Sequence, residues 1–313
     1  MNKIWLKSYP KNIPESIGEL SNSSICDMMK KASHKYSKNI AFTNLNSKLT
    51  YSDVDKYSDN FGAFLQKKLS ISRGSKVAIM LPNLLTYPVT LFGAYKAGAT
   101  VININPLYKS REIESALNDS NAETIIVLDR FLNELELIIK KTNIKNVIVC
   151  SITDLLSFRM SLLVKTIMFF KKSNIKLDKD YIIFADTITN KYNLENVTLE
   201  LDDVALLQYT GGTTGKSKAV ALSHNNLYSN ASSLKEYWHI QKSDRLIHML
   251  PIFHTHGLFV SINIAFLSGL SLYFYERFSL SDLVEALPKS TFPCATKPPE
   301  NVLSPENVCV PLK

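Results

Sequence analysis

An α/β fold, with mostly parallel sheets flanked by helices, is the fold class that this sequence predicts. Short apolar runs alternate with helical segments through the first 150 residues, and turn residues such as Pro82-Asn83 and Gly98 separate them. Strands that alternate with helices pair in parallel, because the chain must cross back over the sheet between them. The 313 residues, 45% hydrophobic and 20% charged, are enough for a large core.

Each element of the first half follows from its local pattern. A hairpin turn is expected at Asn46-Ser47, and Gly98 occupies the position after a helix where glycine commonly ends it. The expected strands are Ile40–Asn44, Leu49–Tyr51, Lys76–Leu81, Ala99–Asn103, Glu123–Leu128 and Asn146–Cys150. The expected helices run from a Ser52 cap to about Leu69, over about Leu84–Ala97, and onward from a Ser110 cap.

The segment Asp154–Lys172 differs from the other helical segments because it is apolar over most of its circumference. Two interpretations remain open. The helix packs on the sheet, which is the commoner fate of an apolar helix, or it lies on a membrane surface. The polar run from 171 to 180 follows it and marks a candidate subdomain break near 173–200.

Charge and cysteine content limit the partners and the compartment. The net charge of +8 and a pI near 9.1 favour anionic partners such as nucleotides, CoA or acidic membranes. Nucleic acid is not predicted, because the lysines are scattered and no recognition motif accompanies them. The four cysteines form no C-x-x-C pair, and the first residues contain no apolar leader segment. No apolar run reaches the roughly 20 residues of a membrane span. We therefore expect a cytoplasmic protein, at most peripheral to the inner face of the membrane.

A glycine- and threonine-rich stretch, YTGGTTGKSKAV at 209–220, predicts a phosphate site. It is not a Walker A loop, because the position five residues before Gly215 is Thr210 rather than glycine. The flanking runs Val204–Tyr209 and Ala219–Leu222 read as strands, and a helix follows only after a Ser223 cap. A loop of this composition between two strands can still direct backbone N–H groups at an anion. The spacing and the flanking strands therefore argue against a separate P-loop NTPase.

At this loop the sequence resembles the AMP-forming acyl-CoA synthetases of the adenylate-forming superfamily. The segments KVAIMLPN, GAYKAGATVININPLY and MLPIFHTHGL agree with that resemblance. The first 150 residues are similar to bacterial long-chain fatty acid-CoA ligases, including WLKSYP near the start. Residues 209–292 are closer to malonyl-CoA synthetases, notably in LPIFHTHGLFV.

The resemblance implies an ATP-dependent ligase that converts a carboxylic acid, most simply a fatty acid, to an acyl-adenylate and then to acyl-CoA. It implies ATP, Mg²⁺ and CoA as the other reactants, and His254 as a catalytic residue near the acyl carboxylate and the α-phosphate. His256 would line the acyl tunnel, His224 would be a surface or cap residue, and Tyr209 and Phe253 would be scaffold aromatics. The implied phosphate-binding residues are Thr210, Gly211, Gly212, Thr213, Thr214, Gly215 and Lys218. Ser217 and Ala219 depart from the usual proline and glycine, which puts the geometry of the loop in question.

The resemblance weakens after Phe292, where the sequence becomes PCATKPPENVLSPENVCVPLK. Residues 1–292 are expected to form an incomplete N-terminal AMP-binding domain, and 293–313 an irregular divergent tail. The family's Gly-x-Thr-Glu motif, its ribose-binding aspartate and its C-terminal lid domain are not recognised, and no metal site can be named. We hypothesise that the residues after about Phe292 result from a frameshift or a premature end of the gene, and that the chain has lost acyl-CoA ligase activity. The alternatives are a malonyl-CoA synthetase-type ligase and a non-catalytic nucleotide or acyl binder.

Overall fold

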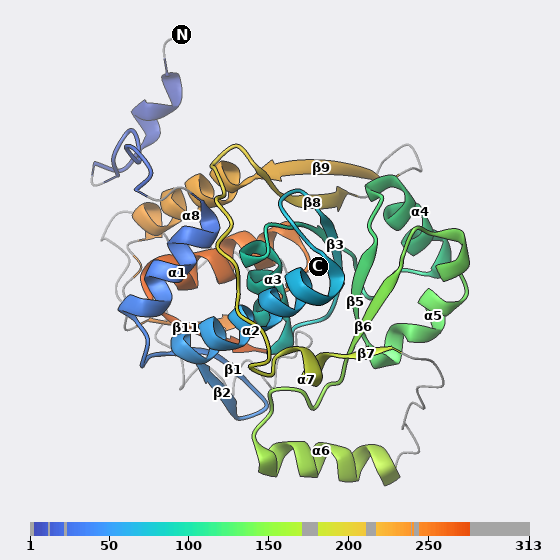
Figure 1. Ribbon diagram of the computed structural model, residues 1–313. Coiled ribbons are helices and arrows are strands. Elements are labelled where there is room, and N and C mark those ends of the chain that lie inside the picture. The colour runs from blue at the N-terminus through green and yellow to red at the C-terminus, as the bar shows by residue number, and fades with distance from the viewer. Residues whose placement is uncertain are drawn as a thin grey trace, which may run out of the picture.

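The structure is a computed structural model that describes residues 3–11, 13–21, 24–170, 181–210, 217–238, 240 and 244–275. Its strands form two sheets, one of seven strands and one of four, with helices beside both (Figure 1). The α/β prediction is confirmed. The expected tail at 293–313 lies outside the described residues.

The seven-stranded sheet has the order β7-β6-β5-β3-β4-β8-β9. All neighbours are parallel except β8 and β9, which form an antiparallel edge. The central strands are buried along their whole length, as expected for parallel strands covered on both faces. The strands are β3 (Lys76–Met80), β4 (Thr100–Asn103), β5 (Thr124–Leu128), β6 (Asn146–Cys150), β7 (Ile182–Ile183), β8 (Val204–Thr210) and β9 (Lys218–Ser223).

Alternate residues of β3 enter two different cores. Val77 and Ile79 belong to the larger core, whereas Ala78 and Met80 face the smaller one. The smaller core is closed by two helices, drawn on the right of Figure 1, and by short 3₁₀ turns beside them. These elements are α4 (Ser110–Ser120), η2 (Asp129–Phe131), α5 (Leu132–Glu136) and η3 (Ile139–Lys141).

The four-stranded sheet joins segments that are far apart in the sequence. Its order is β10-β11-β1-β2, with β1 parallel to β11 and antiparallel to β2. The hairpin turn falls at Leu45 and Asn46, both with positive φ, one residue earlier than expected. The strands are β1 (Ile40–Asn44), β2 (Ser47–Thr50), β10 (Arg245–His248) and β11 (Ser271–Phe274).

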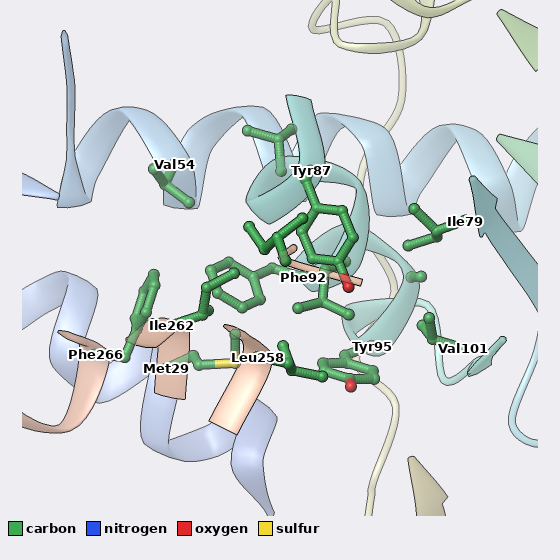
Figure 2. Close-up of a cluster of buried hydrophobic side chains, with 14 of the residues drawn as sticks. Met29, Val54, Ile79, Tyr87, Phe92, Tyr95, Val101, Leu258, Ile262 and Phe266 are labelled. Atoms are coloured by element: carbon green, nitrogen blue, oxygen red, sulfur yellow. The ribbon is translucent and has the colours of Figure 1, made fainter. Parts of the chain in front are cut away.

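The larger core brings together helices from both ends of the described chain. All eleven residues of α3 are buried, and α3 packs on α2. In Figure 2 its aromatic side chains Tyr87, Phe92 and Tyr95 lie near Leu258 and Phe266, which belong to the helices between β10 and β11. The remaining helices are η1 (Ile4–Ser8), α1 (Ile25–Lys35), α2 (Tyr51–Leu69), α3 (Thr86–Lys96), α6 (Phe158–Phe170), α7 (Phe184–Thr187), α8 (His224–Trp238), η4 (Gly257–Asn263) and α9 (Ile264–Ser268).

Two expected helix caps are wrong. Helix α2 begins two residues earlier than predicted, with Thr50 as its cap, and Thr50 and Asp53 form a reciprocal capping box. Ser52 is therefore inside the helix. Ser110 is also inside its helix, because it is the first helical residue of α4 and Lys109 occupies the cap position. The Ser110 hydroxyl donates to a carboxylate oxygen of Glu134.

Helix α6 contradicts the interpretation that the 154–172 segment packs on the sheet. None of its residues is buried, and it projects away from the rest of the molecule at the lower margin of Figure 1. An apolar helix can be stable in a core or against an external apolar surface, and sequence pattern alone does not separate these cases. Residues 171–172 of the segment lie outside the described part.

Candidate functional site

The glycine-threonine loop connects two antiparallel strands. Thr210, the last residue of β8, pairs directly with Lys218, the first residue of β9. The next helix, α8, begins only at His224, after the whole of β9. A Walker loop passes straight into a helix whose N-terminus faces the phosphates, so the rejection of that motif is confirmed by the order of elements.

The residues at the two ends of the loop contact each other. The Ser217 hydroxyl donates to the Thr210 carbonyl oxygen at 2.7 Å, and the Thr210 hydroxyl lies 3.3 Å from the Lys218 carbonyl oxygen. All three residues are exposed to solvent, so the Lys218 ammonium group is available to an anion here, whereas both hydroxyl groups donate to carbonyl oxygens. Five predicted phosphate-binding residues lie outside the described residues: Gly211, Gly212, Thr213, Thr214 and Gly215.

Ala219 and Tyr209, which are paired across the two strands, fix the hairpin to the smaller core. Ala219 lies in regular strand pairing and packs against that core, so alanine causes no backbone conflict at this position. The Tyr209 hydroxyl lies 3.0 Å from the Ala116 carbonyl oxygen and 2.7 Å from a carboxylate oxygen of Asp119. Burial and this carboxylate raise the pKa of Tyr209, so the phenol stays protonated. Tyr209 thus has the contacts of a scaffold residue.

His254 lies between β10 and η4, on a segment held by one buried asparagine. The Asn83 side-chain amide donates to the carbonyl oxygens of Leu250 and Tyr275, each at 2.9 Å. Its side-chain oxygen accepts the Ile252 N–H at 2.8 Å. His254 itself is exposed, its N–H donates to Pro251, and its carbonyl accepts the Leu258 N–H. Asn83 follows β3, so it attaches this segment to the carboxyl end of the large sheet.

Gly257 makes the close turn after His254 feasible. A Cβ atom at this position would lie 2.4 Å from the Pro251 carbonyl oxygen and 2.9 Å from the Ile252 Cα. No side chain fits at that separation, because both obstacles are backbone atoms. The motif PIFHTHG therefore requires its glycine for the local path of the chain.

The loop and the His254 segment lie at the same edge of the large sheet. Strands β3 and β8 both run parallel to β4, so their carboxyl ends, which carry Asn83 and Thr210, share an edge. Between them the Tyr87 hydroxyl donates to the Asn103 side-chain oxygen at 2.8 Å, and the Asn103 amide lies 3.4 Å from Gln208. The crevice at the carboxyl ends of parallel strands is where open α/β sheets bind ligands.

The other histidines differ from the sequence expectations in several ways. His256 is exposed. His224 is buried rather than at the surface, with its ring 5.6 Å from that of Tyr95, and burial lowers its pKa to about 4. His248, which sequence reasoning did not select, is buried at the end of β10 beside Ser261, and burial lowers its pKa to about 3. Neither buried ring carries charge at neutral pH, so both are structural in character.

The described residues fit an anionic ligand better than a resident metal ion. Lys218 and the hydroxyls near it suit phosphate oxygens. Among the residues that the structure describes, no group of three or more His, Cys, Asp and Glu side chains could hold a metal ion. Within the same part of the chain, no helix has both the length and the apolar character needed to cross a bilayer.

Comparisons with known proteins place the chain among adenylating ligases by sequence similarity and by fold. A long-chain-fatty-acid–CoA ligase from Escherichia coli O157:H7 is 34% identical, over 95% of this chain and 54% of its own length. One from Bacillus subtilis is 27% identical, over 92% of this chain and 52% of its own. The crystal structure of a long-chain-fatty-acid-CoA ligase from Archaeoglobus fulgidus superposes with a TM-score of 0.74 at 24% identity. That superposition covers 91% of this chain and 53% of the other.

The chain thus spans about half the length of the curated relatives it matches. The model of one family, described as AMP-binding enzyme, matches residues 29–299. That range contains both strands of the hairpin, the loop between them and the His254 segment. Because the match extends over most of the sequence, the chain belongs to the family of AMP-binding enzymes.

Proposed function

We propose that this chain provides the ATP-phosphate-binding part of an acyl-CoA ligase whose acid substrate is a fatty acid. The observation that carries the proposal is the β8–loop–β9 arrangement, in which Thr210 and Lys218 pair with each other at the carboxyl-end edge of the parallel strands. Open α/β sheets commonly bind ligands at such an edge. The similarity to ligases named for long-chain fatty acids supports the choice of acid.

The proposed reaction has two steps. A carboxylate oxygen attacks the α-phosphorus of ATP, the bond to the β-phosphate breaks, and acyl-adenylate and pyrophosphate form. The CoA thiol then attacks the acyl carbon and releases AMP. Catalysis of this kind depends on positioning and on charge stabilisation more than on covalent participation by the protein.

Three residues of this chain have assigned roles in the first step. Lys218 stabilises the negative charge of the β- and γ-phosphates with its ammonium group, and the Thr210 hydroxyl donates to a phosphate oxygen after it turns away from the Lys218 carbonyl oxygen. His254 orients the acid carboxylate next to the α-phosphate. The glycines and threonines from 211 to 215 supply further N–H and hydroxyl donors. Mg²⁺ would neutralise phosphate charge.

Two alternatives concern the same site. A malonyl-CoA synthetase-type activity would use the same phosphate loop with a dicarboxylic acid, and the motif LPIFHTHGLFV at 250–260 favours it. A non-catalytic nucleotide or acyl binder would bind ATP without forming an adenylate. We also propose that the 313-residue chain by itself is inactive, and that the protein resides in the cytoplasm.

Exchange of labelled pyrophosphate into ATP tests these proposals, because it requires only the first step. Exchange that depends on a fatty acid supports the fatty acid ligase, and exchange that depends on malonate supports the alternative. Either result overturns the proposal that the chain alone is inactive. Calorimetric ATP binding without exchange identifies a nucleotide binder. If the parent chain and Lys218→Ala show no ATP binding at all, the assignment of the phosphate site is wrong.

A further inference from the structure

Helix α6 presents large apolar side chains to solvent. Phe158 is 83% exposed, Phe169 67% and Phe170 79%. Further apolar residues of the helix that are exposed are Leu162, Leu163 and Ile167. Single exposed apolar residues are common on proteins, but six on one thirteen-residue helix form a continuous patch that needs a partner.

The exposure pattern shows which side of α6 faces the protein. Met160, Val164 and Met168 are partly covered and recur every four residues, so they form the inner face. Phe158, Leu162 and Phe169 stand on the opposite side. A surface helix of a globular protein normally presents polar residues outward, whereas α6 presents apolar residues both inward and outward.

Charge identifies the class of partner. Helix α6 carries Arg159 and Lys165 and contains no acidic residue, and the sequence continues with Lys171 and Lys172. A second copy of the chain is a poor occupant, because a symmetric α6 pair would bring these cations close to their own counterparts. An anionic bilayer offers both an apolar layer and opposite charge.

The length of the helix determines how it would bind a bilayer. Thirteen residues span only about 20 Å, which is less than the roughly 30 Å hydrocarbon core. A helix of this length therefore lies in the plane of the interface, with its apolar face below the headgroups. Its distance from the body of the molecule in Figure 1 leaves room for that contact.

We propose that α6 docks the protein on anionic phospholipid bilayers, with Phe158, Phe169 and Phe170 inserted at the headgroup boundary. Arg159 and Lys165 contact the lipid phosphates. This surface goes beyond the ligase function and does not depend on it, because no residue of α6 belongs to the phosphate site.

Flotation of the 313-residue chain with phosphatidylcholine vesicles, with and without phosphatidylglycerol, tests the proposal. The chain should float with the phosphatidylglycerol vesicles. Phe169→Ser/Phe170→Ser should lower its apparent partition coefficient more than about tenfold, which corresponds to about 1.4 kcal/mol. The matched control is Leu107→Ser/Leu137→Ser, which removes two equally exposed leucines elsewhere, at 69% and 71% exposure, and should float like the parent.

A second variant, Arg159→Gln/Lys165→Gln, tests the role of charge without changing the apolar patch. Its preference for phosphatidylglycerol vesicles should decrease about fivefold for each charge removed. Far-UV circular dichroism of all variants should match the parent, since every substituted side chain is exposed. Hydrogen exchange should show new protection at 158–170 on vesicles.

Several outcomes would overturn the proposal. One is a parent chain that remains at the bottom of the gradient with both vesicle types. Another is equal loss of flotation in the Leu107/Leu137 control. Self-association without lipid that Phe169→Ser/Phe170→Ser abolishes would instead identify a second copy as the partner of α6.

Discussion

Asn83 should be among the most sensitive polar residues of the described structure, and Asn83→Ala tests that expectation. The side chain is 2% exposed and makes three hydrogen bonds, to Leu250, Ile252 and Tyr275. At about 1 kcal/mol each, their loss should lower the free energy of unfolding by about 3 kcal/mol.

Equilibrium urea unfolding followed by circular dichroism measures the effect. The midpoint should fall while the slope stays the same, because the surface exposed on unfolding changes little. Asn118→Ala is the matched control, since Asn118 makes one exposed hydrogen bond, to the Lys141 carbonyl at 3.0 Å. It should cost less than about 1 kcal/mol. A loss below about 1 kcal/mol for Asn83→Ala would refute the claim that this residue holds the His254 segment.

Three further predictions concern single positions. Lys218→Ala should weaken ATP binding by about 1.5–3 kcal/mol in calorimetry, and equal affinities would contradict the phosphate assignment. Burial raises the pKa of Asp154 from 3.8 to about 6, so the folded state keeps its proton to higher pH and the parent loses stability as pH rises from about 4 to 6. Asp154→Asn should remove that loss of stability, which is worth up to about 3 kcal/mol. If the urea midpoints of Asp154→Asn and the parent differ by the same amount at every pH, burial of the Asp154 carboxyl does not cause the loss. Gly257→Ala should lower stability by about 1–3 kcal/mol in the same assay, because its Cβ meets the Pro251 carbonyl at 2.4 Å; an unchanged midpoint would show that the turn can relax.

The positions of the parallel strands could be predicted because each is a compact apolar run bounded by turn residues, whereas their order in the sheet comes from the structure. The helix caps were less predictable, since neighbouring hydroxyl residues compete for the same role. Thr50 and Ser52 could each cap α2, because each has an aspartate three residues later, Asp53 and Asp55. The structure places the reciprocal capping box at Thr50 and Asp53.

Long-range contacts explain what sequence reasoning missed. Nothing near Asn83 indicates that its partners lie around residues 250 and 275. The buried ring of His224 contacts Tyr95, which is likewise far away along the chain. For α6, an apolar composition is compatible with a core and with an external surface, so the exposure had to come from the structure.

The pairing of β1 with β11 has a consequence for how this protein is made. Asn44 and Phe274, which are hydrogen-bonded across the sheet, are 230 positions apart. At a synthesis rate of about 5–20 residues per second, β1 waits about 10–50 s on the ribosome before its partner strand exists. An isolated two-stranded hairpin is barely stable in water, so β1 and β2 spend that interval with an open edge. We therefore expect the nascent chain to expose the unpaired edge of β1 until β11 has left the ribosomal tunnel.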